Sequence, residues 1–181
     1  DAGTLLPTLL DRPSHAEQIR SAALSGLGKQ PDAAGLETLL EWAHRGKPRE
    51  CRQAAMRGLS ELAKNVHLSD ATLEHIVNTL IESLKGEQRR LQQSAISALR
   101  ELGDDARPAL PVLSALAAND PDARIRKAAK DAAEKITSAA PEQVQVKELR
   151  DELAKLRDES NEFRKRLEKL EAKPEKTAAE E

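Results

Sequence analysis

Four segments of the sequence repeat one pattern, and this repetition constrains the fold more than any other feature. The same kind of position recurs at offsets of 32, 40 and 34, at Ile19, Cys51, Leu91 and Ile125. Periods of this length are typical of helical repeat arrays, in which each unit packs on its neighbours. The repeated segments span residues 18–27, 50–59, 90–99 and 124–133.

Each segment reads as one face of a helix. An apolar residue is followed three and four positions later by small residues, as Cys51 is by Ala54 and Ala55. That spacing places the three side chains on one face, and the small ones let a neighbouring helix approach closely. Cys51 occupies the same position as Leu91, so we expect a buried structural thiol rather than a nucleophile.

Partner helices are expected between the repeated segments. Asp32 is a suitable N-cap residue for one of these helices, and Ser69 and Asp70 are suitable for another. Pro and Gly residues fall at the junctions. The unit is therefore helix–turn–helix, repeated four times within residues 1–140. The expected partner helices span 32–45, 70–84 and 107–118, with the end of another at 3–10.

Composition supports this class and excludes others. Ala and Leu contribute 29 and 26 of the 181 residues, which is typical of helices. The aromatic residues are Trp42 and Phe163, too few for a surface that stacks on nucleic-acid bases. A net charge of −2 argues against nucleic-acid or anionic-membrane binding by bulk charge, and no apolar run is long enough to span a membrane. Nothing in the sequence fixes a cellular compartment.

Residues 104–136 carry a family resemblance, above all in the run Asn-Asp-Pro-Asp-Ala-Arg-Ile-Arg at 119–126. The chain resembles the HEAT-like repeats of the phycobilisome-lyase type over about residues 3–138. The resemblance implies an all-α fold, a right-handed α-α superhelix of about four helix pairs. Chromophore attachment would follow from that fold by analogy alone. The third repeat departs from the pattern, because Gln92 replaces the expected basic residue.

A narrower similarity concerns residues 39–49, Leu-Leu-Glu-Trp-Ala-His-Arg-Gly-Lys-Pro-Arg. This run is similar to the C-terminal region of bacterial zinc aminopeptidases of the aminopeptidase N type. It implies a HEAT-like domain of a metallopeptidase whose catalytic site lies upstream of this chain. The chain itself has four His residues and no pair one helical turn apart. We therefore expect no enzyme activity, metal or cofactor in this segment.

A different segment follows Pro141. Residues 142–172 contain no Gly or Pro, and apolar residues recur at alternating steps of three and four. This is a heptad pattern typical of a coiled coil over 141–172, and residues 173–181 are expected to be a disordered tail. The predicted seam consists of Val146, Leu149, Leu153, Leu156, Phe163, Leu167 and Leu170, with Ser160 at one a position.

The flanking charges favour a parallel homodimer. In that arrangement Glu152 faces Arg157 and Glu159 faces Arg164 of the second copy, whereas antiparallel pairing places like charges together. The alternative is a helix that folds back to cap the repeats, whose terminal units need a covered face.

Basic residues give the candidate partner-binding positions. A cluster runs from Arg45 to Arg57, interleaved with glutamates, and an Arg recurs at one position of the repeated helix. The recurring Arg is either a basic ridge for a partner or a ladder of inter-repeat hydrogen bonds to acids such as Asp122, and Trp42 is expected in the core. The candidates are Arg20, Arg45, Arg49, Arg52 and Arg126. The expected function is a non-catalytic scaffold or accessory module that binds a protein or peptide.

Overall fold

The computed structural model describes residues 2–85, 88–138, 153, 156–157, 160 and 162–164, without the side chains of 2–4. The chain divides into two units, Asp1–Ala140 and Pro141–Glu181. Described residues form helices, turns and loops, with no strand among them. The predicted all-helical class is therefore confirmed for the part of the chain that is described.

The first unit is a succession of helices joined by short turns. Short 3-10 helices are η1 (Leu9–Asp11), η2 (His15–Glu17) and η3 (Gly103–Ala109). The α-helices are α1 (Ala2–Thr8), α2 (Gln18–Leu27), α3 (Leu36–Ala43), α4 (Arg49–Asn65), α5 (Asp70–Leu84), α6 (Arg89–Leu102) and α7 (Leu110–Asn119), followed by a helix over 123–138.

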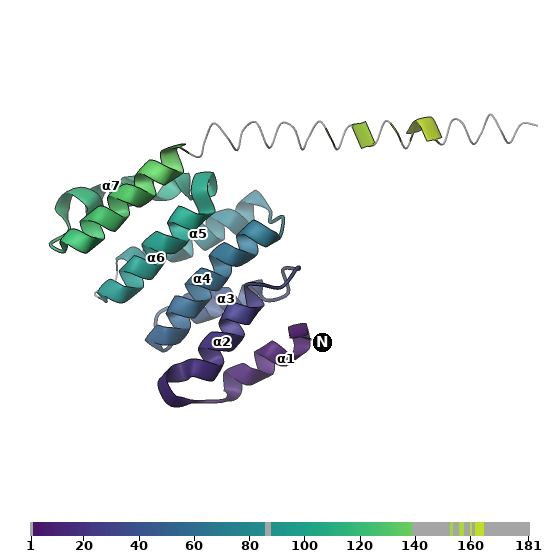
Figure 1. Cartoon of the computed structure of the whole chain (residues 1–181), viewed down its shortest axis with the longest axis horizontal. Helices are drawn as coiled ribbons and strands as arrows, with labels where there is room; N and C mark the ends of the chain where they lie inside the picture. The colour runs from purple at the N-terminus through teal and green to yellow at the C-terminus, as the bar shows by residue number, and fades with distance from the viewer. Residues whose placement is uncertain are drawn as a thin grey trace, which may run out of the picture. The chain divides into compact units, whose positions relative to one another are not determined.

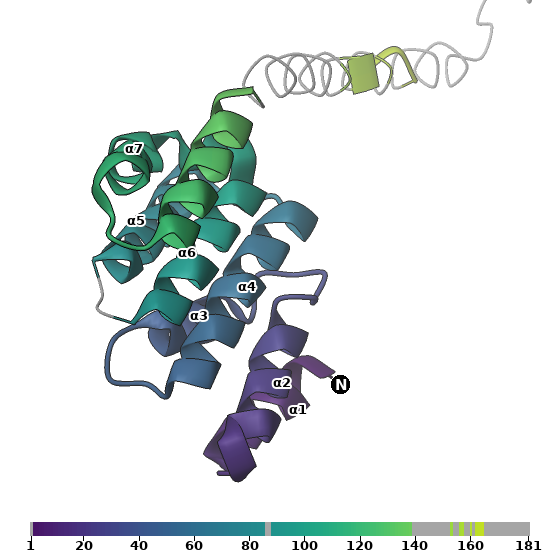
Figure 2. The same ribbon diagram turned by 60° about the vertical axis from the view of Figure 1, so that its left-hand side comes forward.

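These helices alternate between two layers (Figures 1 and 2). We call α1, α3, α5 and α7 the first layer, and α2, α4, α6 and the helix of 123–138 the second layer. Within the second layer α2 packs on α4 and α4 on α6, and across the layers α3 packs on α4 and α5 on α6. Helices of successive pairs therefore lie side by side in the second layer, and in the first layer α3 contacts α5.

The core lies between the layers and follows the repeated pattern. Cys51 and Ile125 are fully buried and Leu91 nearly so, as the sequence predicts, and Leu113 of α7 is fully buried too. Ile19 is different, because 39% of its surface is exposed. The expectation that all four equivalent positions are core is therefore wrong for Ile19. The helices that carry the other three residues each follow an earlier helix of the second layer. Since α2 is the first helix of that layer, Ile19 has no such preceding helix beside it.

Two glycines set the distance between α2 and α4. A Cβ added to Gly28 would lie 2.4 Å from the Cα of Gly58 and 2.6 Å from its carbonyl oxygen. A Cβ added to Gly58 would lie 2.8 Å from a methyl carbon of Leu39 and 3.0 Å from the carbonyl oxygen of Leu24. The two backbones therefore touch at Gly28, where no Cβ fits, and a Cβ at Gly58 would have to displace the side chain of Leu39.

Helix boundaries agree with the sequence in part. Ser69 caps α5 as predicted, since its hydroxyl accepts the amide of Thr72 at 3.3 Å. Asp32 does not cap a helix. Its carboxylate accepts the amide of Ala34 at 3.0 Å within a turn, and α3 begins at Leu36 instead of residue 32. The helix expected over 107–118 runs over Leu110–Asn119, because a 3-10 helix containing Pro108 precedes it.

Of the second unit, the described residues 153, 156–157, 160 and 162–164 are all helical. The seam positions Val146, Leu149, Leu167 and Leu170, and the predicted tail of 173–181, lie outside the described residues.

The close contact at Gly28 predicts the direction in which a substitution there changes the free energy of unfolding. Gly28 has ordinary right-handed backbone angles (φ −65°, ψ −17°), so alanine would stabilise this position if space allowed. We expect Gly28→Ala to lower the free energy of unfolding by about 1–3 kcal/mol, because the added methyl group must push α2 from α4. Urea unfolding followed by circular dichroism measures it.

The matched control is Lys29→Ala, at the exposed neighbouring position, which should change stability by less than about 0.5 kcal/mol. A Gly28→Ala variant as stable as the wild type, or more stable, would contradict the close helix contact.

Candidate interaction surface

The recurring arginines are anchored within their own helix pairs. In each case the guanidinium of a second-layer helix donates to a backbone carbonyl near the end of the first-layer helix that precedes it. Such carbonyls have no partner within their own helix, so a cationic donor satisfies them well. The hydrogen bonds are Arg20 Nε to Leu10 O (2.6 Å), Arg52 Nε to Ala43 O (3.1 Å) and Arg126 Nη1 to Asp120 O (2.7 Å).

Gln92 performs the same task in the third repeat. Its side-chain amide donates to the carbonyl of Leu84, the last residue of α5, at 3.0 Å. The departure from the expected basic residue therefore keeps the donor and removes only the charge. The predicted ladder of inter-repeat bonds to acids is wrong, because these four side chains bond to backbone carbonyls of their own pair. Arg20 also bonds to an acid, but that acid is Glu17, three residues before it.

Three of the five predicted partner-binding residues are thus structural. Arg20 is also paired with Glu17 at 3.0 Å and lies over the ring of Trp42, 5.7 Å from its centroid. Burial lowers the pKa of Arg52, and the nearby Arg45 lowers it further. Side chains held in this way contribute to the joint between the layers, and their part in partner binding stays a prediction.

Trp42 lies at the edge of the core rather than within it. The ring is half-buried against the core. The ammonium group of Lys47 lies 4.5 Å from the centroid of the ring. The same ammonium group forms an ion pair with the carboxylate of Glu41 at 2.5 Å. The prediction of a core tryptophan is therefore only partly right. An indole ring is stabilised when cations lie over its face while the rest of the ring packs against apolar side chains.

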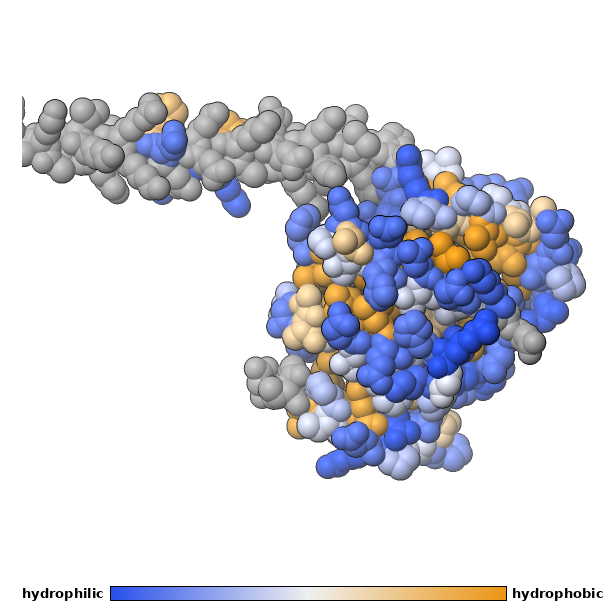
Figure 3. Space-filling model, turned by 180° about the vertical axis from the view of Figure 1, so that it is seen from behind, coloured by the Kyte–Doolittle hydropathy of each residue, from blue (hydrophilic) through white to orange (hydrophobic). Residues whose placement is uncertain are grey.

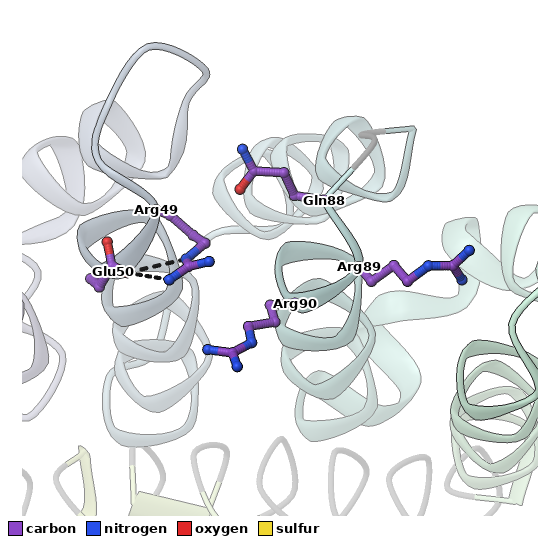
Figure 4. A pocket seen from close by; sticks show the side chains of 5 residues that line it. All are labelled: Arg49, Glu50, Gln88, Arg89 and Arg90. Carbon is purple, nitrogen blue, oxygen red and sulfur yellow. Dashed lines mark hydrogen bonds and ion pairs between the residues drawn. The ribbon is translucent and has the colours of Figure 1, made fainter.

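Arg45 and Arg49 lie on hollows of the surface. Arg45 lines one of about 250 Å³, beside His44, Arg52 and Glu82. Arg49 lines a larger one of about 500 Å³ between the first turns of α4 and α6, which we call the arginine hollow (Figure 4). Its lining residues are Arg49, Glu50, Gln88, Arg89 and Arg90.

The arginines of this hollow differ in how far they are already paired. Arg49 contacts the carboxylate of its neighbour Glu50 at 2.6 Å. Arg89 points away from α4 (Figure 4) and pairs with Asp122 at 3.0 Å. Arg90 is exposed, and among the described residues its guanidinium makes no hydrogen bond or ion pair. The hollow therefore carries the unpaired positive charge of Arg90 and the charge of Arg49, which is partly neutralised by Glu50.

Sequence reasoning found Arg49 but missed Gln88, Arg89 and Arg90. A cluster of charges that are close in sequence does not include these residues, since Arg89 and Arg90 lie 40 positions beyond Arg49 and Glu50. The repeat offset itself holds the missing signal, since shifting Arg49 and Glu50 by 40 positions leads to Arg89 and Arg90. Aligned positions of neighbouring repeats become neighbours in space.

The second unit presents its predicted seam to solvent at every described position. The exposed fractions of Leu153, Leu156 and Phe163 are 57%, 58% and 62%, and Ser160 is exposed as well. These residues are spaced by three, four and three, so one side of the helix carries them all. Large apolar side chains in such a row are typical of a surface that another helix covers.

The described residues contain no group of three or more His, Cys, Asp or Glu that could hold a metal ion. Cys51 is fully buried as predicted, and this burial raises the pKa of its thiol. None of the described helices is both long enough and apolar enough to cross a membrane.

Comparison with known proteins gives no further guide: neither a protein family nor a curated protein matches this sequence.

The carbonyl-capping arginines lead to a prediction for Arg126. Removing its side chain leaves the carbonyl of Asp120 unpaired at the end of α7, so Arg126→Ala should lower the free energy of unfolding by about 1.5–3 kcal/mol. Arg126→Gln should lose clearly less, because Gln92 already makes this contact in another pair. Lys127→Ala, at the exposed next position, is the control for urea unfolding. Equal losses for the alanine and glutamine variants would contradict the capping role.

An ion pair between α4 and α6 predicts a pH dependence. The hydrogen bond from Lys64 lowers the pKa of Glu101. A carboxylate with a lowered folded pKa stabilises the fold above its unfolded pKa, about 4.3, and this contribution is lost as the pH falls through the folded pKa. Glu101→Gln should therefore be about 0.5 kcal/mol less stable than wild type near pH 7 and equally stable in acid.

Unfolding in urea at a series of pH values measures this difference. Glu61→Gln is the control, since Glu61 makes no ion pair within the described residues. A gap between wild type and Glu101→Gln that persists unchanged into acid would show that the pair is not responsible.

Proposed function

We propose that this chain is a non-catalytic interaction module. Its first unit is a short HEAT-like solenoid of four helix pairs that binds a segment of a partner protein on the second layer. Its second unit forms a parallel coiled coil that joins two copies. The observation that carries the proposal is the second layer itself, a row of parallel helices whose polar side chains meet at a basic hollow.

The solenoid part of the proposal is supported by repeated contacts. Each pair uses an equivalent side chain, Arg20, Arg52, Gln92 or Arg126, to join its second helix to the end of its first. Successive second-layer helices then pack on one another. A unit built in this way grows by addition of like pairs and produces an extended surface to which every pair contributes.

The choice of the second layer is supported by its chemistry. The opposite face (Figure 3) mixes polar and apolar side chains. In the first layer, α7 carries the half-buried Leu110, Val112 and Leu116, which pack against the core. The second layer instead offers the arginine hollow and exposed polar residues on neighbouring helices, such as Arg57 and Gln93. Polar groups of fixed position select a partner by charge and hydrogen bonding.

Selection from a library of random 12-residue peptides tests the binding function. The immobilised full chain should enrich peptides whose binding weakens with Gln93→Glu, an exposed substitution on α6. The matched control Asn78→Glu adds the same charge at an exposed position of α5. Enrichment of no peptide, or loss of binding only with the α5 variant, would overturn the proposal.

Sedimentation equilibrium tests the coiled coil. We expect the full chain to be a dimer at micromolar concentration. Leu156→Glu should make it monomeric, because a charge at a seam position must be buried on pairing. Asn161→Glu, at an outer heptad position, should leave the dimer intact. A wild-type chain that stays monomeric at 100 times that concentration would exclude self-association through this helix.

Two copies on one coiled coil would bind a partner with two suitable segments more tightly than one copy does. The second contact becomes intramolecular once the first has formed, so overall affinity rises without any new contact. This gain is a consequence that depends on both halves of the proposal.

A further inference from the structure

We infer that the arginine hollow is a receptor for carboxylate side chains of an acidic peptide segment, with Arg90 as the principal contact. The inference rests on the proposed function and names the chemistry of its partner. The hollow, of about 500 Å³, opens between α4 and α6, and its lining comes from the first turns of both helices (Figure 4). It therefore sits at a joint between two repeats.

The lining selects charge. All five side chains, Arg49, Glu50, Gln88, Arg89 and Arg90, are polar or charged. Sites for drug-like molecules are mostly apolar, so a buried apolar ligand is not what this hollow fits. Three guanidinium groups against one carboxylate leave an excess of positive charge.

Ion pairs within the chain neutralise part of this positive charge but leave the guanidinium of Arg90 available to a carboxylate. Arg89 is committed to Asp122 at 3.0 Å, outside the hollow. Arg49 uses Nε and Nη2 on one oxygen of Glu50, at 3.1 and 2.6 Å. Arg90 keeps all its donors free of protein contacts in the described part of the chain, and Gln88 adds a side-chain amide with no described partner.

The backbone under Arg90 is fixed. Gln53 of α4 donates its side-chain amide to the carbonyl of Arg90 at 3.2 Å, and the hydroxyl of Ser94 donates to the same carbonyl at 3.0 Å. The backbone of Arg90 is therefore held relative to α4, so its side chain starts from a fixed point at the edge of the hollow.

Glu50 behaves as an internal competitor for this site. Its pKa is lowered mainly by the hydrogen bond from Arg49, and the charge of Arg90 adds to the effect. A carboxylate therefore already occupies part of the positive field. Replacing Glu50 by Gln would free Arg49 for an incoming carboxylate.

An acidic peptide fits better than a nucleic acid. The described residues around the hollow include no aromatic ring on which a base could stack. The net charge of −2 also gives the chain no long-range attraction for a polyanion. A peptide carboxylate needs only a local guanidinium group, with which its two oxygens can accept two parallel hydrogen bonds.

Fluorescence anisotropy with the full chain tests the inference. The probe is a fluorescein-labelled 12-residue peptide of repeating Glu-Ser-Asp-Gly, and the control peptide is Gln-Ser-Asn-Gly. We expect Arg90→Gln to weaken binding of the acidic probe about two- to fivefold, the range of one exposed ion pair. Glu50→Gln should strengthen it by a similar factor. Arg57→Gln, an exposed arginine on α4 outside the hollow, should have less effect than either.

The opposite responses of Arg90→Gln and Glu50→Gln separate a site from general charge. Equal losses for Arg90→Gln and Arg57→Gln, equal binding of the two peptides, or displacement of the probe by oligothymidylate at lower charge concentration would each overturn the inference. If library peptides bind the second layer while the acidic probe does not, the inference falls and the proposed function stands. Circular dichroism confirms that every variant is folded.

Discussion

The contact on which this structure depends is the approach of α2 and α4 at Gly28 and Gly58. No side chain separates the helices there, since a Cβ on Gly28 would lie 2.4 Å from the Cα of Gly58. Backbones that touch fix both the spacing and the direction of two helices, because no side chain can adjust to absorb an error. The equivalent place of α6 holds another small residue, Ala98, which is buried as well.

A second constraint acts across the layers. The last carbonyls of a helix lack partners within that helix. In every pair one side chain of the second-layer helix donates to a carbonyl at or just after the end of the first-layer helix, and in the first pair that carbonyl lies in η1. Arg20, Arg52 and Arg126 do this with a guanidinium, and Gln92 does it with an amide. Close packing sets the distance within a layer, and this bond sets the register between layers. The arginine hollow is a result of both, because the first turns of α4 and α6 then stand side by side.

The same geometry separates structural from available charge. Arg52 and Arg90 are both second-layer arginines close to the start of their helices, yet Arg52 is held by the carbonyl of Ala43 and Arg90 is exposed. They differ by two places in the repeat: Arg52 follows the buried Cys51, whereas Arg90 precedes the buried Leu91. On a helix that step turns one side chain toward the first layer and the other toward solvent. Composition or charge counts cannot reveal this difference.

The sequence alone determined the helical class, the position of each repeated helix and most of its buried face, because the 3.6-residue period and the small residues are local signals. It also located the cap at Ser69. Only the tertiary structure decided that Ile19 is exposed and that Arg20, Arg52 and Arg126 bind backbone carbonyls. Those outcomes depend on which helix lies next to which. The arginine hollow belongs to the same class, since residues 40 positions apart meet only when two repeats pack together.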